Sequence, residues 1–262
     1  ENGLIVANGD DPTVMRVLQN AHSPITVYGK QPQSDLFLKD ISLEKDGTRF
    51  TVIQNKSEKS FFITLHGEHN VYNALGVLAL ARHNNIDDDV LSEAFATFQS
   101  VKRRMELRGE ISNIFVYDDF AHHPTAVLKT LKTARSLHSE NRLIAAFEPR
   151  SNTSVQNMMQ TELEEALSLA DRVLLSKPHR MNSIPESKRL NTKVLTENLA
   201  KQGIPASAHD NPDDILKTLK EECRSGDTVM LMSNGAFGNL HQRLLESLKQ
   251  EVKNTATLHS SS

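Results

Sequence analysis

Residues 116–125 read Val-Tyr-Asp-Asp-Phe-Ala-His-His-Pro-Thr, and they predict the end of a strand followed by the start of a helix. The apolar strand ends in two carboxylates, two imidazoles follow, and a proline stands where it suits a first helical turn. In open α/β sheets, ligands bind at the carboxyl ends of strands, beside helix N-termini. We therefore expect Asp118 or Asp119 to hold a ribose hydroxyl, and His122 or His123 to contact a phosphate or polarise a carbonyl. The alternative is a turn whose polar groups only satisfy one another, and adjacent histidines on an extended chain make a poor metal site.

The rest of the chain after residue 105 repeats this alternation of apolar runs with amphipathic segments. Pro124 and Pro212 again occupy first-turn positions. The pattern is typical of a doubly wound, mainly parallel α/β sheet. The expected strands are 105–111, 114–117, 143–147, 172–175, 206–208 and 228–232. The expected helices are 124–137, 156–169, 192–202, 212–224 and 240–249.

The first hundred residues have a different pattern. Two short strands are expected at 4–7 and 25–28, with a helix between them that is capped by Asp11 and opened by Pro12. Three alternating runs follow, and Asp46-Gly47 between the first two is a hairpin signal, so we expect a small antiparallel meander. These runs are 36–43, 49–54 and 61–66, and two helices are expected at 69–84 and 87–99. We place a domain boundary near Lys102, which gives domains at 1–102 and 103–253 and a disordered tail at 254–262.

Composition excludes several classes of protein. The 262 residues carry 30 Lys and Arg against 33 Asp and Glu, a net charge of −3 that disfavours a basic nucleic-acid module. No run approaches the ~18 apolar residues of a membrane span. The single cysteine, Cys223, excludes an intrachain disulfide framework and a multi-cysteine zinc site. We expect a cytoplasmic protein without nucleic-acid or membrane partners, cut from a longer chain because it opens on Glu1-Asn2 without Met.

Two further stretches suggest a nucleotide site. In 67–75, Asn70 and Asn73 lie three residues apart at a helix start, where their amides could read the edge of an adenine. The alternative is that Asn70 caps the helix and Asn73 is solvated. Arg103 and Arg104, at the expected boundary, could reach a phosphate in a domain cleft, or could belong to a solvated basic linker.

Two loops that follow strands complete the candidate site. Residues 147–153 carry Arg150, whose planar fork suits a carboxylate or phosphate. Residues 232–241 contain two glycines that permit close backbone approach to an anion. The 262 residues contain no Gly-x-x-x-x-Gly-Lys-Ser/Thr phosphate loop and no Gly-x-Ser-x-Gly elbow.

Residues 67–73, 103–106 and 118–125, in this order, resemble motifs of the Mur ligase family. Its members join amino acids or peptides to UDP-N-acetylmuramoyl precursors at the expense of ATP. The resemblance implies the second half of a central ATPase domain, with the meander, followed by a Rossmann-like C-terminal domain. It implies these roles: His69, Asn70 and Asn73 at adenine; Arg104 and less certainly Arg103 at the phosphates; Asp119, or else Asp118, at the ribose; His122 near the reacting centre. ATP and Mg²⁺ are the implied cofactors, with the metal ligands outside this chain.

Residues 118–125, 148–153 and 233–241 resemble the family members that accept a murein tripeptide in peptidoglycan recycling. The implied substrates are UDP-N-acetylmuramate and L-alanyl-γ-D-glutamyl-meso-diaminopimelate, in a bacterial cytoplasm. The implied tripeptide contacts are Arg150, Ser151, Asn152, Ser233, Asn234, Gly235 and Gly238. Without the phosphate loop and the N-terminal domains of the family, we expect this chain to be inactive alone. The alternatives are a UDP-N-acetylmuramate–L-alanine ligase and a non-catalytic nucleotide- or peptide-binding module.

Overall fold

The computed structural model describes residues 3–178 and 184–260, with side chains up to residue 254. The chain divides into two compact units, Glu1–Ser100 and Val101–Ser262. The division falls close to Lys102, where the change of sequence pattern suggested a boundary. Each unit has its own sheet and its own hydrophobic core, as expected for an α/β protein built from two domains.

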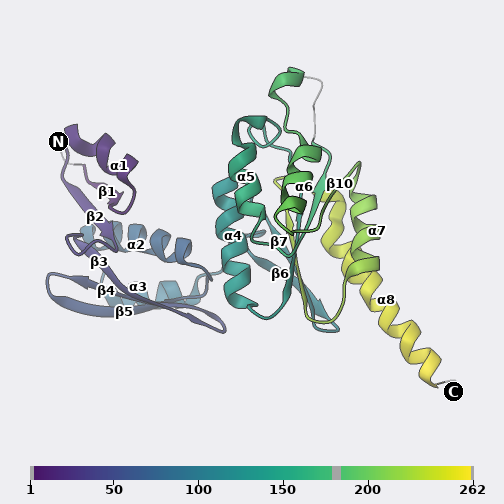
Figure 1. The fold of residues 1–262 in the computed structure, drawn as a ribbon. Coiled ribbons are helices and arrows are strands. Elements are labelled where there is room, and N and C mark those ends of the chain that lie inside the picture. Colours follow the sequence, from purple (N-terminus) through teal and green to yellow (C-terminus); the bar gives the residue numbers. More distant parts are fainter. Residues whose placement is uncertain (1–2, 179–183, 261–262) are drawn as a thin grey trace. The chain divides into compact units, whose positions relative to one another are not determined.

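The first unit contains a five-stranded sheet in the order β1-β2-β3-β4-β5 (Figure 1). The first three strands are parallel, and β3, β4 and β5 form the predicted antiparallel meander. Their bounds are β1 Ile5–Asn8, β2 Ile25–Gly29, β3 Leu36–Glu44, β4 Gly47–Gln54 and β5 Ser57–Ile63. The first hairpin pairs Glu44 with Gly47, so its two-residue turn is Lys45-Asp46 and Gly47 opens the second strand. The hairpin signal was therefore correct, although the glycine lies one position beyond the turn.

Three α-helices accompany this sheet: α1 Pro12–Val17, α2 Glu68–His83 and α3 Asp88–Thr97. A short 3-10 segment, η1 Leu18–Asn20, follows α1. Asp11 caps α1 as predicted, since its Oδ1 accepts hydrogen bonds from the backbone N–H groups of Thr13 and Val14. The core has three mutually packed aromatic rings at its centre, from Phe50, Phe61 and Phe95. These rings join the meander to α3 in one apolar cluster.

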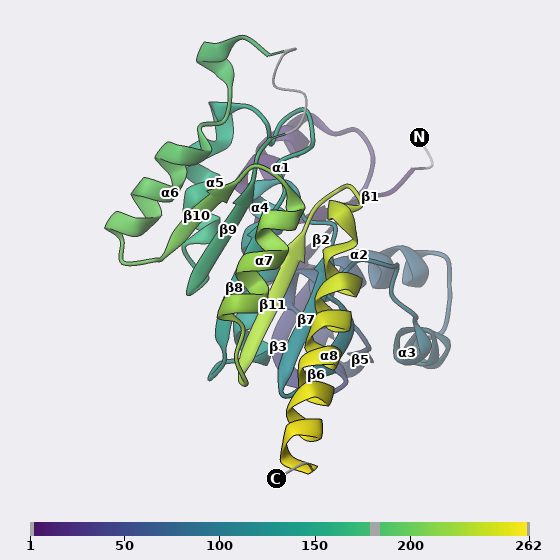
Figure 2. The ribbon, with the colours of Figure 1, turned by 90° about the vertical axis from the view of Figure 1, so that its right-hand side faces the viewer.

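The second unit contains a six-stranded sheet in the order β10-β9-β8-β11-β7-β6, which Figure 2 shows in sequence across the view. All neighbours are parallel except β6, which pairs antiparallel with β7. The bounds are β6 Glu106–Ile111, β7 Ile114–Asp119, β8 Arg142–Phe147, β9 Arg172–Ser176, β10 Ala206–His209 and β11 Asp227–Met232. This is the predicted doubly wound, mainly parallel sheet.

Helices cover both faces of this sheet (Figure 1). One face packs against α4 Pro124–Leu137, α5 Gln160–Leu167 and α6 Thr192–Lys201. The other face packs against α7 Pro212–Glu222 and α8 Leu240–Ser260. The connections of the described residues include the 3-10 segments η2 Asn157–Met159, η4 Glu186–Lys188 and η5 Phe237–Asn239.

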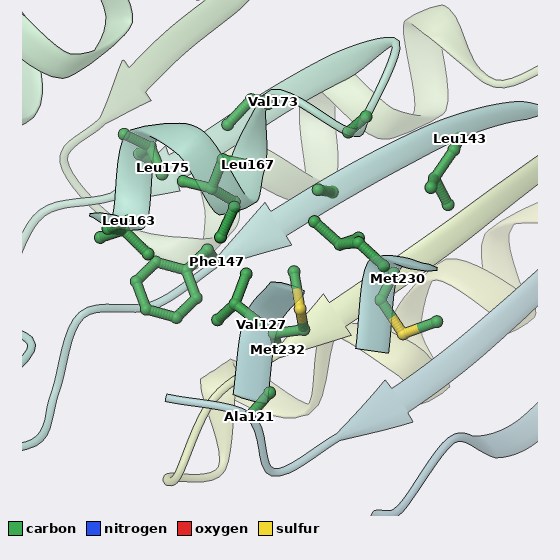
Figure 3. Packing of buried hydrophobic residues seen from close by; sticks show 14 of the residues in the cluster. Ala121, Val127, Leu143, Phe147, Leu163, Leu167, Val173, Leu175, Met230 and Met232 are labelled. Carbon is green, nitrogen blue, oxygen red and sulfur yellow. The ribbon is translucent and has the colours of Figure 1, made fainter. Parts of the chain in front are cut away.

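The ends of β8 and β11 are fixed by the core. Phe147 and Met232, the last residues of these two strands, are fully buried and point into the cluster that contains Val127 and Leu163 (Figure 3). Because buried side chains at 0% exposure hold both strand ends, the loops that follow them start from rigid positions.

Two helix boundaries differ from the sequence prediction by more than two residues. The helix expected from residue 156 begins at Gln160, because residues 151–156 form a hydrogen-bonded turn and η2 follows. The last helix continues to Ser260, so the backbone of the expected disordered tail is helical through residue 260. Residues 250–260 contain no glycine or proline that would end a helix. No helix in the described ranges is both long and apolar enough to cross a membrane.

Candidate functional site

The carboxyl ends of β7, β8 and β11 meet at one edge of the second sheet. Met232 is in register with both Asp119 and Phe147. The backbone N–H of Glu148 donates to Met232 O at 3.0 Å, and that of Ser233 donates to Asp119 O at 3.1 Å. The ladder therefore continues one residue beyond the strands, and it brings together the three loops that the sequence analysis singled out.

Asp119 organises the junction between these loops. Its Oδ2 accepts the Met105 N–H at 2.7 Å, and its Oδ1 accepts the Ala121 N–H at 2.7 Å and the Thr130 hydroxyl at 3.2 Å. Burial raises the pKa of this carboxyl, while these hydrogen bonds act in the opposite direction. The residue is 3% exposed, so both of its oxygens are occupied by the chain itself.

Residues 103–106 form a turn that is fixed by hydrogen bonds. Arg103 and Met105 have positive φ angles of 61° and 48°. The turn is held by hydrogen bonds from the Arg103 N–H to Glu106 Oε2 at 2.8 Å and from the Phe120 N–H to Arg103 O at 2.8 Å. The interpretation as a solvated linker is therefore wrong for Arg103.

The two arginines of this turn differ in what remains available. The Arg103 guanidinium donates to Asp118 Oδ2 at 3.0 Å and to Ser233 O at 2.6 Å. Arg104 is exposed, stands over the Phe120 ring at 5.6 Å, and makes no hydrogen bond to other described residues. Arg103 is thus part of the framework, and Arg104 keeps its donors for a ligand.

The two histidines also have separate tasks. His122 Nδ1 lies 2.9 Å from Phe120 O, and a carbonyl can only accept, so Nδ1 carries the proton. Its Nε2 then presents a lone pair, which suits a hydrogen-bond acceptor or a general base. His123 is the N-cap of α4, and its Nδ1 accepts the Thr125 N–H at 3.3 Å.

Glu148 connects the two remaining loops. It is 1% exposed, and its Oε2 accepts a short hydrogen bond from the Ser233 hydroxyl. Its Oε1 lies 3.8 Å from Arg150 Nη1. The Ser233 hydroxyl in turn accepts the Gly235 N–H at 2.8 Å. A Cβ on Gly235 would lie 2.6–2.7 Å from three atoms of the Arg150 side chain, so only glycine permits this approach.

Of the other predicted peptide contacts, some already make hydrogen bonds within the chain and others do not. The Ser151 hydroxyl donates to Ser154 Oγ at 2.8 Å and accepts the Ser154 N–H at 3.1 Å. Asn152 is exposed, and Asn234 has a buried Oδ1 without a hydrogen-bond partner among the described residues. Gly238 is not part of this network; its carbonyl accepts a hydrogen bond of 3.2 Å from the Arg243 guanidinium.

The predicted adenine residues lie at the start of α2 in the first unit. Asn70 Nδ2 donates to His66 O at 2.8 Å, and Asn70 Oδ1 accepts from Asn73 Nδ2 at 3.3 Å. The helix cap is Gly67, so the alternative in which Asn70 caps the helix is wrong. Asn73 is exposed, and His69 stands half-buried beside it in the same turn.

No group of three His, Cys, Asp or Glu side chains in residues 3–178 and 184–260 could hold a metal ion. The described side chains therefore do not by themselves cluster into a magnesium site.

Comparisons with known proteins bear directly on this arrangement. Residues 103–235, about half of the chain, match the family described as "Mur ligase, glutamate ligase domain". The chain belongs to the Mur ligase family. Residues 1–81 also match the "Mur ligase middle domain", so both units have counterparts in that family.

Two curated Mur ligases illustrate the similarity. The UDP-N-acetylmuramate–L-alanyl-γ-D-glutamyl-meso-2,6-diaminoheptandioate ligase of Escherichia coli is 36% identical over 191 residues, 72% of this chain and 40% of that protein. The UDP-N-acetylmuramate–L-alanine ligase of Psychrobacter cryohalolentis is 30% identical over 245 residues, 92% of this chain and 50% of that protein. The chain thus spans about half the length, or less, of these relatives.

A solved structure supports the same assignment. The murein peptide ligase of Psychrobacter arcticus superposes with a TM-score of 0.69 at 32% identity, covering 94% of this chain and 51% of that one. The α/β architecture of both units is therefore that of the middle and C-terminal parts of a Mur ligase.

Sequence reasoning missed several polar residues of this Mur ligase chain. In the first unit, Asp10 Oδ2 accepts the Lys30 N–H at 2.7 Å and the Tyr72 hydroxyl at 2.6 Å, at the carboxyl ends of β1 and β2. In the second unit, Glu148 and Ser154 organise the loop of Arg150. The available signal was an acid within two residues of a strand end: Glu148 follows β8 directly, and Asp10 lies two residues beyond β1.

Proposed function

We propose that this chain is the nucleotide- and acceptor-binding part of an ATP-dependent ligase that joins L-alanyl-γ-D-glutamyl-meso-diaminopimelate to UDP-N-acetylmuramate. One observation carries the proposal: the loop of residues 148–154 folds against residues 233–235 and leaves the Arg150 side chain 43% exposed beside a buried acid. A held but open guanidinium suits the carboxylate of an amino-acid or peptide acceptor. The choice of the tripeptide over L-alanine is supported by the 36% identity to the Escherichia coli tripeptide ligase, against 30% to the L-alanine ligase.

The reaction has two steps in this proposal. A muramate carboxylate oxygen attacks the γ-phosphorus of ATP, ADP leaves, and an acyl phosphate forms. The amine of the tripeptide's L-alanine then attacks the acyl carbon, the bond to phosphate breaks, and inorganic phosphate departs. The amine must lose a proton, and His122 Nε2 is the acceptor that this unit offers at the strand ends.

The nucleotide roles follow from what each side chain has left to offer. In the first unit, Asn73 and Asn70 would contact adenine beside His69. In the second unit, Arg104 would contact phosphate. For the ribose, we favour Asp118 over Asp119, because the bond from Arg103 uses one oxygen of Asp118 whereas both oxygens of Asp119 already accept hydrogen bonds.

We propose further that the chain alone does not catalyse ligation. Phosphoryl transfer relies on backbone amides, a lysine and a divalent cation around the transferred group. The sequence contains no Gly-x-x-x-x-Gly-Lys-Ser/Thr loop. ADP formation that requires both UDP-N-acetylmuramate and tripeptide, in a preparation containing only these 262 residues, would refute this part of the proposal.

Direct binding tests the acceptor. Calorimetric titration of the chain with the tripeptide and, separately, with L-alanine should show binding of the tripeptide only. A preference for L-alanine would favour the second candidate, an L-alanine ligase. The similarity to the Psychrobacter cryohalolentis L-alanine ligase, which extends over 92% of this chain, supports that candidate. Binding of neither ligand would contradict the assignment of the acceptor site to this unit.

A further inference from the structure

Glu148 is a buried carboxylate that sequence reasoning gave no role. Taking a charge out of water is unfavourable unless it is paired and hydrogen-bonded. At 1% exposure, Glu148 has the Ser233 hydroxyl on one oxygen and the Arg150 guanidinium, 3.8 Å away, on the side of the other. A buried acid in this position favours a positive charge beside it, and Arg150 forms such an ion pair.

The backbone around Glu148 makes this acid a fixed point. Its N–H extends the ladder to Met232 O at 3.0 Å, and Pro149 behind it is buried and restricts its backbone to extended conformations. Its partner Ser233 is also held twice, by Asp119 O through the N–H and by Arg103 through the carbonyl.

Arg150 is constrained on two further sides. Its side chain lies flat against the bare Cα of Gly235, and its backbone N–H donates to Ser154 Oγ at 3.1 Å. A guanidinium has five N–H donors, and Glu148 is the acid paired with this one within the described part of the chain. The side chain is 43% exposed and makes no hydrogen bond to other described residues, so donors remain for a ligand.

We propose that Glu148 is a positioning residue that presets Arg150 to bind a carboxylate of the acceptor peptide. This inference rests on the proposed function for the identity of the ligand. Glu148 does not touch the peptide; it acts by holding the Arg150 fork in one orientation before the ligand arrives, so that less freedom is lost on binding. Ser233 belongs to the same device, because its hydroxyl is used on Glu148 rather than on a ligand.

The test compares Glu148→Gln and Glu148→Asp with the unaltered chain, using the tripeptide and a tripeptide whose carboxyl groups are primary amides. Glu148→Gln keeps the shape and the contact with Ser233 but removes the charge. It should weaken binding of the anionic tripeptide by about 2- to 13-fold, the effect of ordering one long side chain on binding. Binding of the amidated peptide should not change, and Glu148→Asp should restore part of the lost affinity.

A double-mutant cycle separates positioning from a general structural effect. If Glu148 acts through Arg150, Glu148→Gln combined with Arg150→Ala binds no more weakly than Arg150→Ala alone. The matched control is Asp227→Asn, which removes a buried acid from the Arg142 ion pair at the opposite ends of the same strands, β8 and β11. This control should lower stability without changing peptide affinity.

A second readout does not depend on the ligand. By NMR, the Arg150 Nε–H should exchange more slowly with water in the unaltered chain than in Glu148→Gln, and Glu148→Asp gives the same comparison should the glutamine variant unfold. Three results would overturn the inference. They are equal Arg150 Nε–H exchange rates in the variant and the unaltered chain, an equal loss of affinity for the anionic and the amidated peptide in Glu148→Gln, and additive losses of affinity in the double-mutant cycle. Failure of the unaltered chain to bind tripeptide, with slowed Arg150 exchange, would instead contradict the proposed function and leave the positioning role supported.

Discussion

Arg103 donates a 2.6 Å hydrogen bond from its guanidinium to the backbone carbonyl of Ser233, 130 residues further along the chain. The same guanidinium is bonded to Asp118 at 3.0 Å. One side chain therefore ties the turn at the start of the second unit to the ends of β7 and β11. Within the second unit, the residues proposed to contact phosphate and ribose and those proposed to bind the acceptor share this framework.

We expect Arg103→Ala to destabilise the second unit by about 1–3 kcal/mol, since it leaves a buried hydrogen-bonded carboxylate without its partner. Because the Asp118 side chain is only 8% exposed, water cannot fully replace the lost hydrogen bond from Arg103. Amide hydrogen exchange in β7 and β11 measures this loss locally. Unchanged exchange in both strands would show that the arginine is dispensable to the framework.

Arg104→Ala should have the opposite profile. Its side chain is exposed and has the ring contact with Phe120 but no hydrogen bond to other described residues, so we expect a stability change within about 0.5 kcal/mol. Loss of a charge-assisted hydrogen bond of about 1.5–3 kcal/mol should weaken ATP binding roughly tenfold or more. An NMR titration of the chain with ATP checks this, with Arg108→Ala as the control. Equal affinities for the Arg104 variant and the unaltered chain would remove Arg104 from the phosphate site.

Hydrophobic periodicity was sufficient to predict both sheets, because a period of two and strict strand–helix alternation are properties of local sequence. The positions of the loops at strand ends also follow from it. What local sequence does not contain is pairing over distance. Glu148 accepts a hydrogen bond from Ser233, which lies 85 residues further along the chain. Arg103 and Met105 have positive φ angles although neither is a glycine, so the sequence does not indicate this turn.

The choice between the two aspartates shows the same limit. Asp118 and Asp119 are adjacent, and the sequence favoured Asp119 for the ribose only by resemblance. Their side chains point to opposite faces of β7, as alternation in a strand requires. Asp119 meets three donors on one side, whereas Asp118 meets Arg103 on the other. Only the packed structure shows which donors each carboxylate meets.

Asn73→Ala should weaken ATP binding if α2 contacts adenine. One hydrogen bond in a partly buried site is worth about 1–3 kcal/mol, or roughly 5- to 150-fold in affinity. Asn84→Ala is the matched control, because Asn84 is an exposed amide at the other end of the same helix and bonds Leu80 O. Equal effects of the two substitutions would indicate a change in the helix rather than in a nucleotide contact.

Glu106 gives a prediction about pH. The Arg103 N–H donates to its carboxylate, and this hydrogen bond, opposed by burial and helped by Arg108, lowers its pKa below the ordinary value of 4.5. Because the folded-state pKa is lowered, the stabilising contribution is complete above pH 4.5 and is lost as pH falls through the lowered folded-state value. The Arg103 amide resonance should therefore titrate with a midpoint below 4.5, and in Glu106→Gln this transition should vanish. A midpoint at or above 4.5 would contradict the hydrogen bond as the cause.

Gly47→Ala and Gly235→Ala form the last prediction, because each glycine admits a close neighbour of a different kind. A Cβ at Gly47 would lie 2.1 Å from the backbone oxygen of Ile63, which cannot move without breaking the β4–β5 pairing, so we expect a loss of about 1–3 kcal/mol in the first unit. A Cβ at Gly235 meets only the flexible Arg150 side chain, at 2.6 Å from Cδ. Arg150 can swing away, so stability should change by less than about 1 kcal/mol while tripeptide affinity falls. Hydrogen exchange in each unit, together with peptide titration, separates the two outcomes. If tripeptide affinity fell in Gly47→Ala but stayed unchanged in Gly235→Ala, the close packing of Arg150 on Gly235 would not matter for peptide binding.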